Sequence, residues 1–164
     1  MRTLITIVIL LIFSLAIKAE KKIDITPIKL PYDSLVLTDI YAYSATILVR
    51  SENTIYKSTD NGDNWKISFD SEKKVNQLYS QDPHTIFIVG DSGMVYRTFD
   101  YGDNWIDISY SPDQNFKGIA AKDYKDYMII SDRRAYINNK NSLKGEITTL
   151  DFISDIPLYK VLFS

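Results

Sequence analysis

The sequence predicts an all-β fold, a partial (open) β-propeller of about three four-stranded antiparallel blades preceded by a signal peptide. The first observation behind this prediction is a turn sequence that occurs twice, at 58–65 and at 98–105. A fixed period of roughly 20 to 50 residues is typical of repeat architectures. The second observation is a series of short β-branched and aromatic runs bounded by Asn, Asp, Gly or Ser, a pattern that indicates β-strands.

Residues 1–19 are predicted to be a signal peptide. Arg2 supplies the positive start, Leu4–Ile17 is an apolar run, and Ala19 is a small residue suited to cleavage. The run is shorter than the roughly 20 residues that span a bilayer, although an uncleaved anchor stays open as the alternative. The chain has no cysteine, which excludes disulfides, a lipid anchor on a leading cysteine and cysteine-based zinc sites. We therefore expect a secreted or periplasmic bacterial protein.

The charge balance argues against a polyanionic partner. The chain has 19 basic and 21 acidic residues, a net charge of -2, and removal of Arg2 and Lys18 with the signal peptide makes the net charge more negative. Such a chain has no general attraction to nucleic acid or to an anionic membrane. We expect neither nucleic-acid binding nor stable membrane insertion after cleavage.

Two complete blades are predicted after an N-terminal segment at 20–34. The first blade covers about 35–70 and the second about 75–110. Each contains four short runs separated by turn residues. The expected strands are Val36–Tyr43, Thr46–Arg50, Thr54–Ser58 and Trp65–Phe69, followed by Val75–Ser80, Thr85–Val89, Met94–Phe99 and Trp105–Ser109.

A third blade is predicted at about 116–152 and the start of a fourth at about 157–164. The third blade lacks the repeated turn, which Asn138–Asn141 replaces, and Leu158–Phe163 would open the fourth. Radial arrays close at about 4 to 8 blades, so this number would leave an open sheet face and an unpaired edge. We expect part of a larger propeller or a truncated product, with self-association through the open blade edges as the remaining alternative.

Each position of the repeated turn has a predicted structural role. The hydroxyl residue and the aspartate can form hydrogen bonds within the loop, as in Asx-type turns. The glycine supplies a positive φ, and the tryptophan buries a large ring whose indole N–H needs an acceptor. These residues are Ser58, Asp60, Gly62 and Trp65 in the first turn and Thr98, Asp100, Gly102 and Trp105 in the second.

The spacing Ser/Thr-x-Asp-x-Gly-x-x-Trp resembles the Asp-box, or BNR repeat, of WD40/YVTN/BNR-like propellers. It is similar to the repeats of the photosystem II assembly/stability factor family and of sortilin- and sialidase-type propellers. The resemblance covers about residues 36–137 and is carried by the two turns. For the assembly-factor family it implies binding of other proteins rather than catalysis, although this chain lacks the arginine-rich patch of that family.

Calcium binding is the alternative role for the turns, because Asp60, Asp63, Asp100 and Asp103 carry oxygen ligands. In an EF-hand loop the glycine stands further from the first aspartate and a glutamate closes the loop. The observed spacing therefore favours a structural turn. No metal ligand and no cofactor are predicted.

Catalysis is an alternative to binding because sialidases share the box. The resemblance implies an arginine triad, but the mature arginines are few, and Arg97 is expected to be an exposed strand residue. The only histidine, His84, follows Asp82-Pro83 and is expected to be a solvated loop residue. No catalytic residue is predicted and the chain is not expected to be an enzyme. The alternative is the N-terminal part of a sialidase- or xyloglucanase-type glycoside hydrolase.

The function expected from the sequence is that of an exported scaffold that binds a protein or a glycan. The binding surface would be the loops opposite the repeated turns or the mouth of a central channel. Tyr56 and Tyr96, at equivalent positions of the repeat, are interpreted as packing residues, and Glu72–Lys74 as a solvated loop.

Overall fold

The computed structural model describes residues 27, 30, 34–132, 134–138 and 148–150. Within this part of the chain every strand belongs to one of three four-stranded antiparallel sheets, which confirms the predicted all-β fold. The predicted signal peptide at 1–19 and the predicted strand Leu158–Phe163 lie outside the described residues. Among the described residues there is no helix with the length and hydropathy that crossing a membrane requires.

Each sheet is a simple meander in which strands pair in chain order. We call the three sheets blades 1, 2 and 3. Blade 1 contains β1 (Leu37–Tyr43), β2 (Thr46–Ser51), β3 (Thr54–Ser58) and β4 (Lys66–Phe69). Blade 2 contains β5 (Val75–Ser80), β6 (Ile86–Gly90), β7 (Val95–Thr98) and β8 (Ile106–Asp107). Blade 3 contains β9 (Gly118–Ala121), β10 (Tyr127–Ile130), β11 (Ala135–Asn138) and β12 (Thr148–Leu150).

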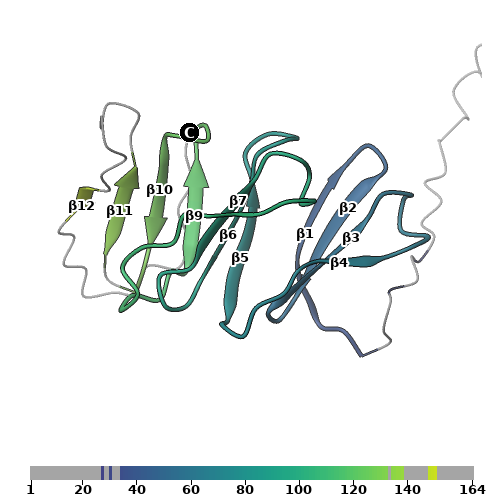
Figure 1. Ribbon diagram of the computed structural model, residues 1–164, viewed down its shortest axis with the longest axis horizontal. Coiled ribbons are helices and arrows are strands. Elements are labelled where there is room, and N and C mark those ends of the chain that lie inside the picture. The colour runs from purple at the N-terminus through teal and green to yellow at the C-terminus, as the bar shows by residue number, and fades with distance from the viewer. Residues whose placement is uncertain (1–26, 28–29, 31–33, 133, 139–147, 151–164) are drawn as a thin grey trace, which may run out of the picture.

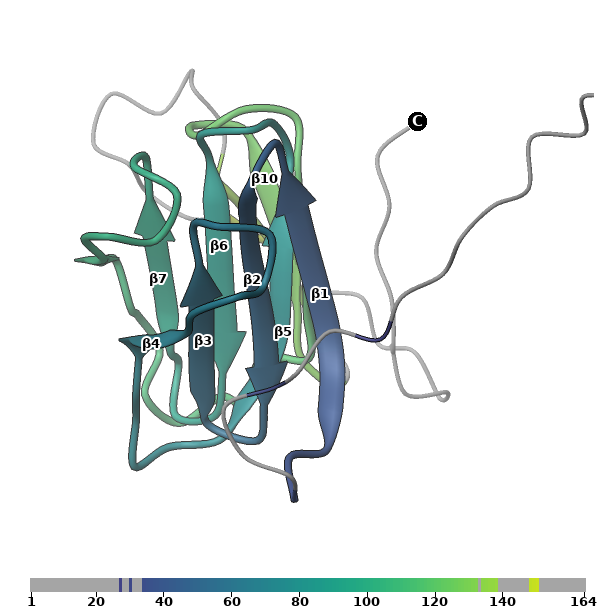
Figure 2. The same cartoon turned by 90° about the vertical axis from the view of Figure 1, so that its right-hand side faces the viewer.

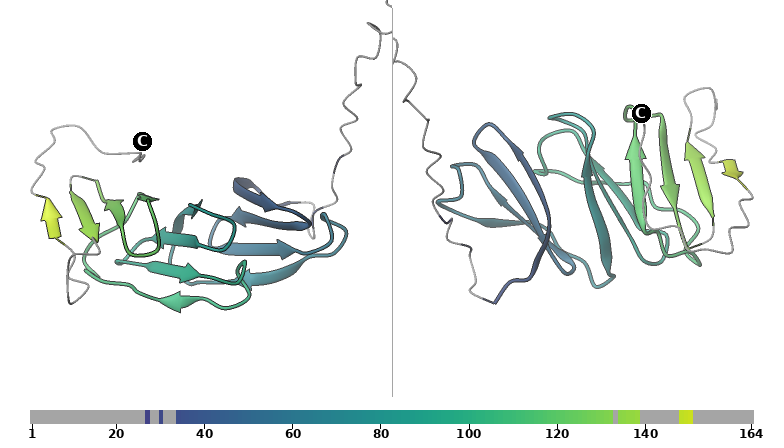
Figure 3. Two further views of the ribbon diagram at one scale, coloured as in Figure 1. Left: turned by 90° about the horizontal axis from the view of Figure 1, so that it is seen from above. Right: turned by 180° about the vertical axis from the view of Figure 1, so that it is seen from behind.

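The blades follow one another along the longest axis of the molecule (Figure 1). The first strands of consecutive blades are neighbours, since β1 contacts β5 and β5 contacts β9. Viewed along the row of blades, β1 and β5 lie on one side and β4 and β7 on the other (Figure 2). Seen from above, the sheets stack face to face along an arc (Figure 3). This is the arrangement of propeller blades.

The core lies between the blades rather than inside any one of them. Ile86, Phe87, Ile88 and Val89 of β6 are all 0% exposed. Side chains of a strand alternate between its two faces, so two of these residues face each neighbouring blade. Ile86 and Ile88 pack in the cluster shared with blade 1, and Phe87 and Val89 in the cluster shared with blade 3. Burial on both faces explains the unbroken apolar run in the sequence.

Strand β8 is shorter than the predicted strand Trp105–Ser109. It ends at Asp107 because Ser109 bonds to β7 through its side-chain hydroxyl and not through its backbone groups. The Ser109 hydroxyl oxygen accepts from Val95 N at 3.1 Å and donates to Val95 O at 3.3 Å. The Asp107 carboxylate accepts from Ser109 N at 2.8 Å. Hydrogen bonds from Ile108 N and the Ser109 side chain to Val95 therefore continue the pairing with β7 beyond the last residue of β8.

The connections gather at the two ends of the blades. The turn end contains the hairpin loops 44–45, 81–85 and 122–126 and the two repeated turns, and there Asn61 N donates to Ala45 O at 3.0 Å. The linker end contains the hairpin loops 52–53 and 91–94, the loop residues 131, 132 and 134, and the inter-blade linkers 70–74 and 108–117. There Asp91 N donates to Lys74 O at 2.9 Å, and Phe116 N donates to Gly90 O at 3.0 Å. Each linker is thus fixed to a hairpin of blade 2.

Candidate functional site

The first repeated turn is organised by its aspartate and serine. Asp60 Oδ1 accepts from Ser58 Oγ at 2.8 Å and from Asn64 N at 2.9 Å. Asp60 Oδ2 accepts from Asn64 Nδ2 at 2.7 Å. Ser58 Oγ in turn accepts from Gly62 N at 2.8 Å. Two side chains therefore satisfy the backbone donors of Asp60, Gly62 and Asn64.

The second repeated turn has the same hydrogen bonds. Asp100 Oδ1 accepts from Thr98 Oγ1 at 2.7 Å and from Asn104 N at 2.9 Å, and Asp100 Oδ2 accepts from Asn104 Nδ2 at 2.8 Å. Thr98 Oγ1 accepts from Gly102 N at 3.0 Å. The asparagine that donates twice to the aspartate was missed in the sequence. This asparagine stands at the same position of both turns, and that recurrence in the sequence could have predicted its role.

Positive φ angles occur at two consecutive residues of each turn. Gly62 has φ 98° and Gly102 has φ 82°, as their positions in the turn predicted. The preceding residues, Asn61 at 60° and Tyr101 at 59°, are also in the left-handed region. Asparagine tolerates that region, whereas a bulky aromatic residue rarely adopts it. The conformation of Tyr101 was therefore not predictable from its residue type.

The two tryptophans are half-buried and find different acceptors. Trp65 Nε1 donates to Gly62 O of its own turn at 3.0 Å. Trp105 Nε1 donates at 3.1 Å to Ser68 Oγ, which lies in β4 of blade 1. The Trp105 ring also lies edge-on to Phe69, with ring centroids 5.7 Å apart. The second turn therefore docks on the preceding blade.

Asp103 strengthens this junction between blades 1 and 2. Its carboxylate oxygens lie 2.8 Å from Lys57 Nζ and 2.9 Å from Lys66 Nζ. The Lys57 side chain is 2% exposed, and its pairing with Asp103 provides a counter-charge for a buried ammonium group. The hydrogen bond from Lys57 is the largest of the causes that lower the pKa of Asp103. The junction thus joins β3 and β4 of blade 1 to the turn of blade 2.

Hydrogen bonds within the turns lower the pKa of both central aspartates. The side chain of Asn64 is the main donor that lowers the pKa of Asp60 to about 2. At Asp100 partial burial raises the pKa, but the bonds from Asn104 and Thr98 outweigh it and bring the value to about 2. Both groups are therefore ionised at neutral pH.

We predict an acid-sensitive component of stability from these two carboxylates. Because each pKa in the folded chain lies below the ordinary value of 3.8, the stabilisation is complete above that value and is lost as the pH falls towards about 2. Urea melts at a series of pH values should show the loss in the parent chain and a shallower loss in Asp100→Asn. Parallel curves for the two proteins would contradict the assignment.

No metal centre is formed by the aspartates of the turns. Among the residues that the structure describes, no three His, Cys, Asp or Glu side chains come together in a group that could hold a metal ion. The carboxylates of Asp60 and Asp100 bind donors of their own turn, and that of Asp103 binds two lysines. The arrangement suits a structural turn and an inter-blade contact.

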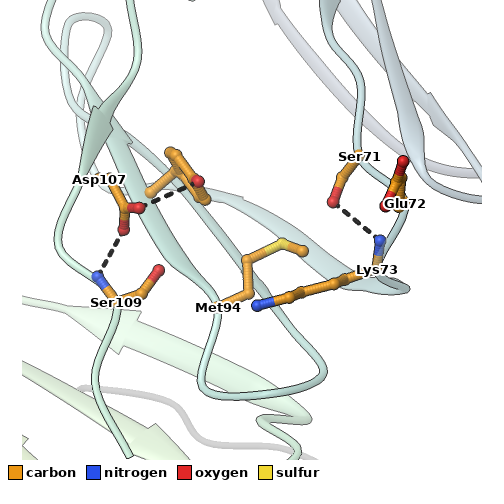
Figure 4. Close-up of a pocket in the computed structure, with 7 residues that line it drawn as sticks. Ser71, Glu72, Lys73, Met94, Asp107 and Ser109 are labelled. Atoms are coloured by element: carbon orange, nitrogen blue, oxygen red, sulfur yellow. Dashed lines mark hydrogen bonds between the residues drawn. The ribbon is translucent and has the colours of Figure 1, made fainter. Parts of the chain in front are cut away.

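A groove at the linker end is the candidate binding site. It has a volume of about 290 Å³ and is formed by the linker between blades 1 and 2 together with β7, β8 and the residues beside them. Figure 4 shows Ser71 and Glu72 on one side, Asp107 and Ser109 on the other, and Lys73 alongside Met94 between them. The lining residues are Ser71, Glu72, Lys73, Met94, Tyr96, Asp107 and Ser109.

Polar groups in the groove are held in fixed orientations. Tyr96 Oη donates to Asp107 Oδ2 at 3.1 Å, and the Tyr96 ring lies edge-on to Phe69 with centroids 4.8 Å apart. Hydrogen bonding from Ser109 lowers the pKa of Asp107, and burial followed by the Asp107 carboxylate raises the pKa of Tyr96. The groove therefore offers a carboxylate, a phenol and an apolar thioether. Tyr96 packs between blades as interpreted, and it also lines this site.

A second, more polar groove lies at the next blade junction of the linker end. It has a volume of about 380 Å³ and joins the linker between blades 2 and 3 to the β10–β11 hairpin. The lining residues are Asp113, Gln114, Asn115, Ser131, Asp132 and Arg134. Both grooves lie at the end of the blades away from the repeated turns. Sequence reasoning missed their residues because each groove combines an ordinary polar linker with a neighbouring blade.

The expectation that Arg97 is an exposed strand residue was wrong. Its side chain is half-buried, with the guanidinium 4.8 Å from the centroid of the Phe99 ring. Arg97 Nη1 donates to Tyr124 O, and the guanidinium lies 5.6 Å from the centroid of the Tyr124 ring. Arginine packs well on aromatic faces, which accounts for its position between blade 2 and the loop of blade 3.

Comparison with known proteins identifies the fold and no closer relationship. No protein-family model matches the chain, and no curated protein matches it in sequence. A solved structure of YCF48 bound to a D1 peptide is similar with a TM-score of 0.59 and 13% identity, over 82% of this chain and 45% of that one. An ancestral GH74 enzyme is similar with a TM-score of 0.54 and 15% identity, over 74% of this chain and 19% of that one.

These similarities are too low in identity to transfer an activity, and they show the fold alone. The fold is that of a β-propeller module. The chain spans less than half the length of either solved protein. The similarity of this chain therefore covers only part of each of the two solved proteins.

Proposed function

We propose that this chain is an exported, non-catalytic propeller module that binds a protein or glycan partner, and that its repeated turns are Asp-boxes with a structural role. The observation that carries the proposal is the groove at the linker end, in which the linker between blades 1 and 2 and strands β7 and β8 of blade 2 surround one cavity. Concave sites with a few oriented polar groups are the usual form of binding sites. The apolar run at the start of the chain supports export.

A peptide segment is the partner that this groove fits best. Its lining combines Met94, an adaptable apolar side chain that is buried, with exposed charges of both signs on Glu72, Lys73 and Asp107. Such a mixed lining suits an extended segment with alternating apolar and charged side chains. The similar fold of YCF48, described as bound to a D1 peptide, supports a protein ligand for this module.

We predict that charge reversal at Lys73 weakens peptide binding about tenfold, because one charge in the lining of the groove changes sign. The probe is a set of peptides selected from a random library on the full chain, with affinities measured by calorimetry. Lys74→Glu is the matched control, because Lys74 is an exposed neighbour that does not line the groove. Failure to select any peptide, or equal affinities for both variants, would refute a peptide site at this groove.

Glycoside hydrolysis is the second candidate function. One observation favours it: two carboxylic residues, Glu72 and Asp107, line the same groove, and glycosidases use such a pair. The similarity to an ancestral GH74 enzyme agrees with it at the level of fold. Fluorogenic glycosides incubated with the chain distinguish the two functions. Hydrolysis that Asp107→Asn abolishes would establish an enzyme and replace the binding proposal.

A further inference from the structure

A cluster of aromatic side chains lies at the turn end, on the side of the blades away from the groove, with Tyr43 and His84 exposed and Tyr101 half-buried. The rings of Tyr43 and Tyr101 are stacked with an interplanar angle of 14° and centroids 6.2 Å apart. The ring of His84 lies against Tyr101 with centroids 4.9 Å apart. Tyr43 is 47% exposed, although a large aromatic ring contributes most to stability or binding when it is covered. These three residues form what we call the ring surface.

The ring surface is held in place by hydrogen bonds below it. Tyr41 Oη, in β1, donates to Pro83 O at 2.7 Å and fixes the loop that carries His84 to blade 1. Asp82 Oδ1 accepts from His84 N at 2.8 Å and closes the same loop. A binding surface with fixed side chains loses little conformational entropy when it takes a ligand.

The backbone at Tyr101 indicates that its ring has a role beyond the fold. Tyr101 has φ 59°, and the equivalent residue of the first turn, Asn61, has φ 60°. Asparagine is the residue that adopts this conformation at low cost, and both turns have the same internal hydrogen bonds. A tyrosine at this position therefore costs stability that an asparagine would avoid. Such strain is concentrated at functional sites.

A second pair of exposed rings continues the aromatic character at the next blade junction. Phe99 is 41% exposed and Tyr124 is 42% exposed, and their rings are edge-to-face with centroids 5.6 Å apart. Phe99 lies just before the second turn, and Tyr124 lies in the first hairpin loop of blade 3. Aromatic pairs thus occur at two successive blade junctions of one end. Rings repeated at intervals suit a ligand that is itself a chain of repeated units.

We infer that the ring surface binds an uncharged glycan chain, with sugar rings stacked on Tyr43 and Tyr101. The apolar C–H face of a pyranose matches the negative face of an aromatic ring. The phenol of Tyr43 can bond sugar hydroxyls, as can Tyr101 Oη and His84 Nε2, which lie 3.5 Å from each other. The inference rests on the proposed function in one respect, that the chain is a binding module. It does not depend on the groove, because the ring surface lies at the opposite end of the blades.

Two observations favour an uncharged glycan over other polymers. Backbone N–H groups of the second turn already donate to Thr98 and Asp100, so a peptide would find few main-chain partners there. The carboxylate of Asp100, next to Tyr101 in the chain, is ionised at neutral pH and disfavours an anionic polysaccharide at the ring surface. Arg97 and Lys125, by contrast, lie over the rings of the second pair.

The test is calorimetric titration of the full chain with cellohexaose, xylohexaose and chitohexaose, and with a decaproline peptide as the alternative class. At least one hexasaccharide should bind, and Tyr101→Asn should weaken that binding about tenfold, the effect of one stacked ring. The Tm of Tyr101→Asn should equal or exceed that of the parent chain, because asparagine relieves the strained backbone.

A tyrosine that serves only packing between the blades would behave differently, since its replacement would lower the Tm. The inference would be overturned if Tyr101→Asn lowered the Tm or left the affinity for the hexasaccharide unchanged. It would also be overturned if no hexasaccharide bound, or if decaproline bound in place of the sugars. Lys73→Glu, which lies in the groove, should leave hexasaccharide binding unchanged. The experiment therefore distinguishes failure of the glycan inference at the ring surface from failure of the proposed peptide site at the groove.

Discussion

Replacement of Gly93 by alanine is expected to lower the free energy of unfolding by about 3–5 kcal/mol. This is the largest loss expected from any of the test substitutions. Gly93 has φ 70°, a region that residues with a Cβ rarely adopt. A Cβ at this position would lie 2.0 Å from Tyr110 O and 2.6 Å from Ser111 O. Both obstacles are backbone atoms, so the linker between blades 2 and 3 would have to move.

The position of Gly93 explains why the chain cannot absorb this change. Gly93 N donates to Gln114 O, and Tyr110 N donates to Gly93 O at 3.1 Å, so the linker wraps around the glycine. Urea melts of the parent chain and Gly93→Ala measure the loss. Gly118→Ala is the control, because its Cβ would have no neighbour closer than 3.4 Å. A control that loses as much stability as Gly93→Ala would disprove the role of the close approach.

Removal of the Asp103 carboxylate is expected to cost about 2–3 kcal/mol, because it leaves the buried Lys57 ammonium without its partner. The cost is below that of a fully buried pair, since Asp103 is itself 47% exposed and partly solvated. The variant is Asp103→Ala, and equilibrium urea unfolding is the measurement. The second lysine, Lys66, is 62% exposed and should contribute little to the loss.

The first turn supplies the matched control for Asp103. Asp63 stands at the equivalent position, is exposed, and forms no ion pair with any residue between 34 and 132. Asp63→Ala should therefore change the free energy of unfolding by less than about 0.5 kcal/mol. Equal losses in the two variants would mean that the aspartate acts within its own turn, and the inter-blade role would be excluded.

The repeat made the fold class and the local geometry of the turns predictable. Equal spacing of the two turns, together with short β-rich runs, was enough to expect sheets that succeed one another. Asp60 and Gly62 then follow from local rules, because a short side chain bonds to nearby backbone and a positive φ selects glycine. These interactions span only a few residues, so their residues are visible together in the sequence.

Contacts between blades could not be predicted in the same way. Lys57 and Asp103 come from different repeats, and the spacing of a repeat does not give the rotation between successive blades. Arg97 shows the consequence: it occupies the position of Lys57 in the next repeat but packs on aromatic rings instead of an aspartate. The loops opposite the repeated turns were expected to bind, but the residues of the groove around Lys73 were missed for the same reason, since they come from a linker and the following blade.

The ion pair of Asp103 and Lys57 adds to the contacts of Trp105 in holding the second turn of blade 2 against blade 1. A double-mutant cycle with Lys57→Met, Asp103→Ala and the double variant, measured by urea unfolding, tests this role most directly. Methionine fills the space of the buried stem without a charge, so we expect a coupling free energy of about 1–2 kcal/mol. A coupling within about 0.5 kcal/mol of zero would contradict that role.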